Sequence, residues 1–159
     1  MASVRGIPHI HRKAPDMHAP IFVNLPVTDI DRSRAFFTEL GYAFNESFCD
    51  DRTIVVVLAD NVFAMLLQRG VFDSLHPLKT ADVTEVKECV ICLGVDRREA
   101  VDTLVDRAIA AGGTAGDCED EEFMYGRSFN DLDGHSWQIF WTASATAEVG
   151  AAKVAAQRG

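Results

Sequence analysis

The sequence predicts an α+β fold in which two β-α-β-β-β modules pair and their curved sheets form a cup. The first observation is an internal repeat: strand, helix and three strands occur twice, and Leu25–Val27 returns as Leu93–Val95, 68 residues later. The second is that each unit alone would leave an apolar sheet face, which pairing with the other unit can bury. The concave faces left over would line the cup, a shape that commonly binds small molecules.

Composition limits the class of protein. The chain has 159 residues, of which 48% are hydrophobic, so we expect one folded domain. No apolar run approaches the roughly 20 residues of a membrane span, and the N-terminus lacks an apolar signal segment, so we expect no membrane partner and a cytoplasmic location. The net charge of −9 repels phosphate backbones, which argues against a nucleic-acid partner.

The first module is predicted to span residues 21–67. Ile21–Val27 alternates as a strand does, and Asp29 is a suitable N-cap for a helix that runs to Leu40. Gly41 then ends the helix, because glycine readily adopts the left-handed conformation needed there. Three strands are expected to follow, at Tyr42–Phe48, Thr53–Ala59 and Val62–Leu67.

The second module is predicted to span residues 88–142 and to repeat this order. Glu88–Val95 reads as a strand, and Asp96 with Glu99 forms an acidic variant of the capping box for a helix to about Ala111. Gly112 and the glycine after it stop the helix. Three further strands are expected at Thr114–Cys118, Phe123–Asn130 and His135–Thr142, the last two joined by a tight Asp133-Gly134 turn.

The two modules together make one domain over residues 21–142. Residues 68–87 form the linker between them, with a short helical piece near Val71–His76. Residues 1–20 are rich in proline and histidine and are predicted to be an extended arm or a leader, while residues 143–159 form an Ala-rich tail.

Gln138 is the most informative residue of the last strand. It shares one strand face with Ser136 and Phe140, whereas His135 and Trp137 share the other. An amide buried without a partner costs roughly 1–3 kcal/mol, so Gln138 is either held in a hydrogen-bond network or turned toward a ligand.

Five other residues are candidate ligand contacts, each with a structural alternative. Asn24 could reach the cup or bridge backbone groups, and Phe22 and Phe140 could stack on a planar ligand or belong to the core. Tyr125 and Arg127 share a strand face and could bind an anion, although Arg127 could equally pair with the acidic residues before it.

Three further features read as structural. His135 is expected to support the turn rather than to act as a base. The acidic segment 117–122 lacks calcium-loop spacing and is expected to be a solvated loop. Cys89 and Cys92 have zinc-like spacing, but residues three apart on a strand point to opposite faces, so buried structural thiols are expected.

A family resemblance follows from two of these segments. Residues 21–41 resemble the opening of proteins of the vicinal oxygen chelate superfamily, which includes glyoxalase I, bleomycin-resistance proteins, fosfomycin-modifying enzymes and extradiol dioxygenases. Residues 124–141 resemble the close of a bacterial branch often labelled predicted lactoylglutathione lyase. The likeness covers residues 21–142 and is specific for the fold more than for function.

The resemblance also implies four metal-ligand positions, which fall here on Phe22, Ala64, Val90 and Gln138. The first three side chains have no lone pair, and one neutral amide oxygen does not hold a divalent ion. A shift by one residue at Ala64 or Val90 adds only Cys89 as a donor. We therefore expect no metal cofactor.

The resemblance implies a homodimer with a small-molecule ligand. The first hypothesis is a metal-free protein that binds a small organic molecule in the cup, with aromatic and antibiotic-like compounds as the candidate ligands. The alternative is a glyoxalase-type lyase, isomerase or dioxygenase with a non-standard or metal-free site. A third hypothesis is a regulatory or assembly protein whose cup is vestigial.

Overall fold

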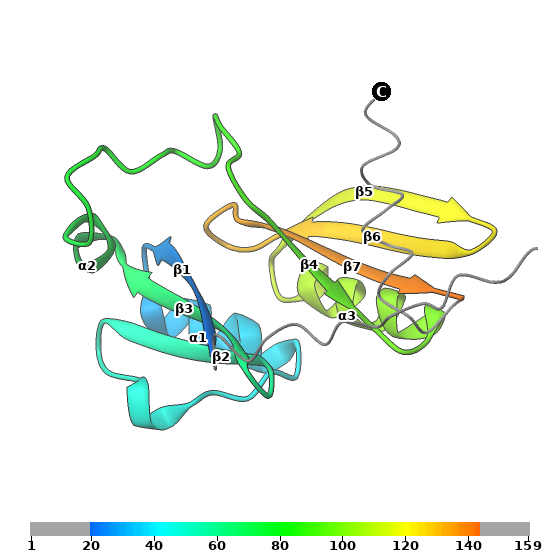
Figure 1. Ribbon diagram of the computed structural model, residues 1–159, viewed down its shortest axis with the longest axis horizontal. Coiled ribbons are helices and arrows are strands. Elements are labelled where there is room, and N and C mark those ends of the chain that lie inside the picture. Colours follow the sequence, from blue (N-terminus) through cyan, green and yellow to red (C-terminus); the bar gives the residue numbers. More distant parts are fainter. Residues whose placement is uncertain (1–19, 144–159) are drawn as a thin grey trace, which may run out of the picture.

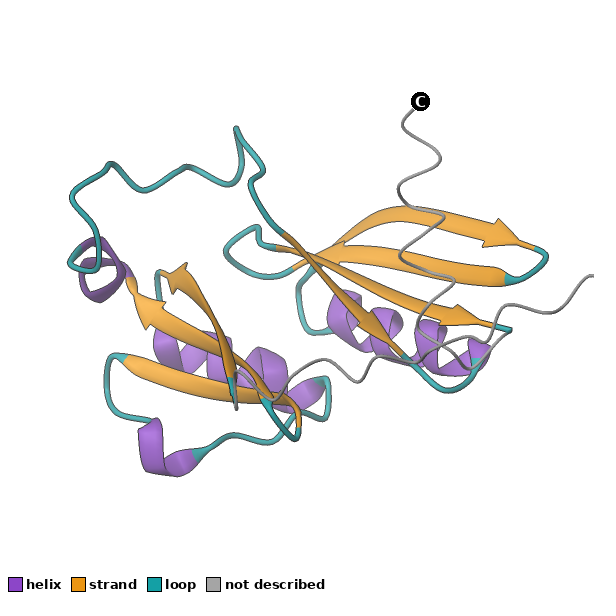
Figure 2. Ribbon diagram, in the orientation of Figure 1, coloured by secondary structure: helices purple, strands orange, loops and turns teal. Residues whose placement is uncertain are grey.

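The computed structural model describes residues 20–143 and confirms the α+β class (Figures 1 and 2). The first sheet has the strand order β1-β3-β2, and the second has the order β4-β7-β6-β5. The predicted arm and tail lie outside the described residues, apart from one residue at each end. None of the described helices is long and apolar enough to cross a membrane.

The first module is built as the sequence predicts around its helix. Strand β1 (Ile21–Val27) pairs in parallel with β3 (Val62–Gln68), which pairs antiparallel with β2 (Thr53–Ala59). Helix α1 (Ile30–Glu39) begins after Asp29, whose carboxylate accepts a hydrogen bond from the Arg32 amide at 2.9 Å. Gly41 follows its end with φ of +92°, as a helix-terminating glycine should.

The prediction of a strand at Tyr42–Phe48 is wrong. Only Phe44 forms an isolated bridge, to Val56, and Glu46–Phe48 is a 3₁₀ turn, η1. Around that bridge the amide of Asn45 donates to the Val55 carbonyl and the amide of Val57 donates to the Ala43 carbonyl, both at 2.9 Å. Beyond it the chain turns, and the amide of Phe48 donates to the Asn45 carbonyl. The Cys49 thiol also donates to that carbonyl and accepts from the Val55 amide, which holds the turn against β2. The segment therefore pairs with β2 at one bridge and then turns, so it does not extend into a strand ladder.

The second module contains all four of its predicted strands. They are β4 (Val90–Gly94), β5 (Thr114–Glu121), β6 (Met124–Asn130) and β7 (Ser136–Thr142), with α3 (Arg98–Ala110) between β4 and β5. Two details differ from the prediction. Helix α3 begins after Arg97 without a side-chain capping bond, so the Asp96–Glu99 capping box is not formed. The acidic segment is largely part of β5, an exposed edge strand on which charges are well tolerated.

The two modules share one core between their sheets and helices. In the core, the Phe36 ring lies 6.2 Å from that of Phe129, and the Phe37 ring lies 5.4 Å from that of Trp137. Each pair joins α1 of the first module to the second sheet. The modules therefore do not have separate hydrophobic cores, and burial of these aromatic rings holds them together.

The turn between β6 and β7 makes further bonds from the second module to the first. The amide and hydroxyl of Thr28 both donate to the Asp133 carboxylate, at 2.9 and 2.8 Å. The His135 Nε2 atom lies 2.6 Å from the Pro26 carbonyl oxygen, in hydrogen-bonding contact. Gly134 has φ of +92°, which confirms the tight turn, and its carbonyl accepts from the Lys87 ammonium.

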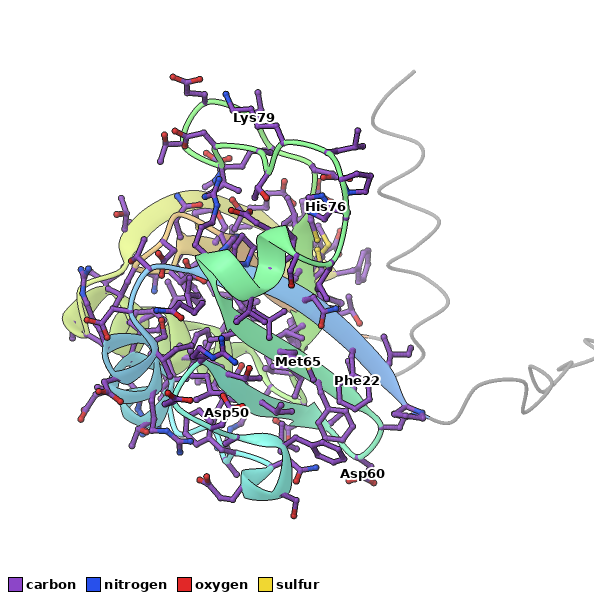
Figure 3. The ribbon with its side chains drawn as sticks, turned by 90° about the vertical axis from the view of Figure 1, so that its left-hand side faces the viewer. Phe22, Asp50, Asp60, Met65, His76 and Lys79 are labelled. Carbon is purple, nitrogen blue, oxygen red and sulfur yellow. The ribbon has the colours of Figure 1, made fainter. Side chains whose placement is uncertain are left out.

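Each sheet has a helix face, packed on α1 or α3, and an open face on its other side. In the first sheet Leu25, Ala64 and Leu66 are in the core, so their strand neighbours such as Phe22 and Met65 lie on the open face (Figure 3). In the second sheet Trp137 and Ile139 are in the core, which puts Gln138 on the open face.

The residues 69–89 connect the modules by way of the short helix α2 (Arg69–Asp73), and Figure 1 shows this linker arching from α2 to β4.

Candidate ligand-binding site

A cavity of about 630 Å³ lies between the edge strands β1 and β4, against the linker. This volume is within the range of small-molecule sites in proteins, roughly 300–1,000 Å³. Both modules and the linker contribute to its wall. Its apolar part is formed mainly by Val23, Leu25, Phe72, Leu78, Val83 and Ile91.

Four polar side chains of the cavity wall are already engaged in the protein. Thr80 donates to the Asp73 carboxylate and Ser136 donates to Asn130 at 2.7 Å. Lys87 and His135 make the bonds to the β6–β7 turn and to β1 described above. These four groups shape the cavity, and each has at least one hydrogen-bond partner within the protein.

Asn24, His76 and Lys79 also border the cavity, and they make no side-chain hydrogen bond within residues 20–143. The ring of His76 packs edge-on against Phe72, with centroids 5.3 Å apart. Its Nδ1 atom is buried and has no hydrogen-bond partner in the described part of the chain. Figure 3 shows that His76 and Lys79 both come from the linker. These three side chains can bind a ligand, and Glu88 and Cys89 are further polar groups of the wall.

Gln138 lies outside this cavity, on the open face of the second sheet. Its Oε1 atom accepts a hydrogen bond from the Cys92 thiol at 3.2 Å, across the β4–β7 pair. Partial desolvation by its neighbours raises the pKa of this thiol, although the residue is exposed, and Cys89 and Glu119 nearby act in the same direction. Phe140 lies on the same face, with its ring against the bare Cα of Gly94. The predicted ligand role of Gln138 and Phe140 stays a prediction.

The other predicted ligand residues are divided between three places. Asn24 borders the cavity, and Phe22 stacks on Phe63 on the open face of the first sheet, with ring centroids 5.0 Å apart. Tyr125 and Arg127 lie on the helix face of the second sheet. The structure therefore does not bring the six residues into one site.

Tyr125 and Arg127 are bound by carboxylates of α3. Both donate to Asp102 Oδ1, at 2.7 and 2.8 Å, and Arg127 also donates to Asp106 at 2.9 Å. The partners of Arg127 are thus on the helix, not in the acidic segment that precedes it in the sequence. Hydrogen bonds from the tyrosine and the arginine lower the pKa of Asp102.

Neither tyrosine is expected to ionise before about pH 12. The hydrogen bond to Asp102 raises the pKa of Tyr125 to about 12, and burial raises the pKa of Tyr42 to about 12. The chain has two tyrosines, so absorbance at 295 nm should show almost no tyrosinate at pH 10.5 in the folded protein. Tyrosine in the unfolded chain ionises near pH 10, so these groups favour the fold fully below pH 10 and lose that contribution as the pH rises to about 12.

The matched variants are Asp102→Asn and Asp106→Asn. The first removes the charged acceptor of Tyr125 and should bring half of the tyrosinate signal to lower pH. The second should leave the titration unchanged, because Asp106 bonds Arg127 and not the tyrosine. Equal titrations in both variants would contradict this account.

Two structural expectations have different outcomes. His135 is buried and bonded to Pro26 beside the turn, which agrees with a supporting role. The expectation of buried thiols is wrong: Cys89, Cys92 and Cys118 are exposed and Cys49 is half-buried. The reason is that Cys92 lies on the open face of β4, while Cys118 lies on the exposed edge strand β5.

The four metal positions implied by the family do not fit a metal ion. Phe22, Val90 and Gln138 lie on open faces, but Ala64 points into the core, and its neighbours Phe63 and Met65 take the open face. Cys92, beside Gln138, is a thiol with a raised pKa and is less ready to act as a thiolate ligand. No group of three or more His, Cys, Asp or Glu side chains within residues 20–143 is placed to hold an ion.

Sequence reasoning did not pick out the linker residues His76 and Lys79. Residues 68–87 were expected only to connect the modules. A signal was present in that His76 is, with His135, one of two histidines in residues 21–142, and that Lys79 and Lys87 are the two lysines of that range. Their convergence depends on the path of the linker over β1 and β4, which no local pattern encodes.

Comparisons with known proteins agree with this architecture. Residues 21–57 match the family described as bleomycin resistance protein-like N-terminal. A hypothetical protein from S. aureus is similar in structure, with 28% identity, a TM-score of 0.67, and coverage of 79% of this chain and 94% of that chain. No curated protein matches the sequence.

Two more distant structures show the same fold. A glyoxalase-related enzyme from Fulvimarina pelagi is 18% identical, with a TM-score of 0.67 and coverage of 77% of this chain and 86% of that one. A fosfomycin resistance protein from Mesorhizobium loti is 13% identical, with a TM-score of 0.58 and coverage of 84% and 98%.

The fold is thus that of glyoxalase/bleomycin-resistance-like proteins. The predicted vicinal oxygen chelate superfamily is confirmed by the family match and the structural neighbours. The narrower label of lactoylglutathione lyase is not confirmed.

Proposed function

We propose that this protein binds a small organic molecule in the cavity between β1, β4 and the linker. The observation that carries the proposal is the cavity itself, about 630 Å³ with mainly apolar walls and a few polar groups free to bind. Such a combination is typical of small-molecule sites. We expect no metal at the ligand positions implied by the family, because Phe22, Ala64 and Val90 carry no lone pair.

The proposal includes assembly as a homodimer. Supporting it, Phe22 is 39% exposed and Val90 is 52% exposed, and both lie on open sheet faces. Apolar sheet faces of this kind are normally covered by another protein surface. A second copy of the chain would cover them and would deepen the cup around Gln138.

Adding a bulky side chain to the cavity wall is expected to abolish ligand binding. Ala81 borders the cavity from the linker, so Ala81→Trp should remove hits found by saturation-transfer NMR with a library of small organic compounds. Glu85→Trp is the matched control, because Glu85 is exposed on the same linker away from the cavity and should retain the hits.

Two results would contradict the proposal. Hits that survive Ala81→Trp would place binding elsewhere on the protein. Formation of S-lactoylglutathione from the methylglyoxal–glutathione hemithioacetal would favour the lyase hypothesis.

A further inference from the structure

His76, which borders the cavity, has one buried ring nitrogen that the protein does not satisfy. His76 Nδ1 has no hydrogen-bond partner within residues 20–143, although the ring is held in place by the edge-on contact with Phe72. A buried polar atom without a partner is unfavourable in free energy, because it has lost its hydrogen bonds to water and gained none in the protein. A ligand that bonds this atom recovers that free energy, so His76 is a natural anchor for whatever occupies the cavity.

The charged residues of the cavity wall indicate the sign of the charge that a ligand should carry. Lys79 and Lys87 border the cavity, and Glu88 is the one carboxylate among its wall residues. The chain as a whole carries −9, so this excess of positive charge is local. Lys87 is bonded to the β6–β7 turn, which leaves the Lys79 ammonium as the more available cation.

Lys79 does have an acidic neighbour outside this cavity. Its ammonium is close enough to Asp82 to contribute to the lowered pKa of that carboxyl, although hydrogen bonds from Thr84 are the larger cause. Asp82 is exposed and already accepts two hydrogen bonds from Thr84, at 2.9 and 2.6 Å. An exposed pair of this kind is weak and leaves Lys79 able to bind an anion.

We propose that the ligand is a small organic acid, with an apolar body against the cavity wall and a carboxylate bound by His76 and Lys79. This inference rests on the proposed function and narrows it to one chemical class. Asn24, on the β1 side of the cavity, supplies an amide N–H as a further donor. The uncharged part of the ligand packs on side chains such as Leu25, Phe72 and Ile91.

The test uses pairs of probes that differ only in charge. Phenylacetate, 4-methylpentanoate and indole-3-acetate are each titrated beside the corresponding amide into the ¹⁵N-labelled full chain, followed by two-dimensional NMR. At least one acid should bind about tenfold more tightly than its amide, because hydrogen bonds to charged groups are stronger than those to neutral groups.

Three variants test which residues cause the preference for the acid over the amide. His76→Phe keeps an aromatic ring beside Phe72, and Lys79→Gln keeps a hydrogen-bonding side chain of similar length; each should bring the ratio of acid to amide affinity close to one. Arg52→Gln removes one positive charge from an exposed site away from the cavity and should leave the ratio unchanged. Without ligand, His76→Phe should have a melting temperature equal to or above that of the parent protein, since it removes an unpaired buried polar atom.

The outcomes separate this inference from the proposed function. Equal binding of acids and amides, or tighter binding of the amides, overturns the acid class while the cavity remains a binding site. Failure of all six probes to bind contradicts both. A preference that persists in both His76→Phe and Lys79→Gln overturns the assignment to these residues, and a lowered melting temperature in His76→Phe without ligand indicates a structural role for His76.

Discussion

Replacing Phe37 with alanine is expected to lower the free energy of unfolding by about 3–5 kcal/mol, the usual cost of truncating a fully buried aromatic side chain. Phe37 is 1% exposed and its ring makes edge contacts with Phe36, Tyr42 and Trp137. Because Trp137 belongs to the other module, the cavity left by Phe37→Ala opens at the junction of the two halves. The change should therefore weaken both modules in one cooperative transition.

Urea denaturation followed by circular dichroism measures this loss. The control is Phe48→Ala, because Phe48 is 58% exposed on η1 and its truncation should change stability by no more than about 0.5 kcal/mol. Two separate unfolding transitions in Phe37→Ala, with one unchanged from the parent protein, would contradict the shared core.

Asp131→Ala is expected to cost roughly 3–5 kcal/mol, because it removes the acceptor of three N–H groups at once. The Asp131 carboxylate is 7% exposed and accepts from the amides of Asp133 and His135, at 3.0 and 2.9 Å, and from the indole of Trp137 at 3.0 Å. These bonds hold the turn that carries the Thr28 and Pro26 contacts. Losing them should loosen the junction of the modules as well as the turn.

The variant Asp131→Asn keeps the shape of the side chain and removes its charge, so it separates the two contributions to stability. The amide keeps one oxygen for the backbone N–H groups but presents N–H to the Trp137 indole, so it should cost less than Asp131→Ala. Burial raises the pKa of Asp131, which means that the charged form is held at some cost and that its removal offsets part of the loss. Asp60→Ala, in the exposed β2–β3 turn, is the control and should be nearly neutral. An Asp131→Ala protein as stable as this control would contradict the role of the carboxylate.

Most of the fold could be predicted because its signals are local. Asp29 and Gly41 mark the ends of α1, Asp133-Gly134 marks the last turn, and alternation along β7 assigns Trp137 and Gln138 to opposite faces. Tyr42–Phe48 could not be predicted, because its alternating pattern is typical of a strand while Cys49 and Asn45 bind the backbone into a turn. Such bonds depend on the approach of β2, which the pattern does not contain.

The candidate site was much less predictable than the fold. Period-two alternation gives the face of a residue, but it does not say which face is covered by a helix. Tyr125 and Arg127 were grouped with Gln138 as ligand contacts, whereas the position of α3 puts them on the opposite side of the sheet, beside Asp102. Asn24 is the one predicted ligand residue that borders the cavity, because the rest of the wall depends on the path of the linker.

The contacts of the β6–β7 turn also affect how the chain can fold during synthesis. Thr28 and Pro26 leave the ribosome long before Asp133 and His135, which are 105 and 109 residues further along the chain. The aromatic side chains of α1 have to wait equally long for Trp137. The first module therefore emerges with apolar surface that stays uncovered until the second module is made, and exposed surface of this kind makes a nascent chain prone to aggregation.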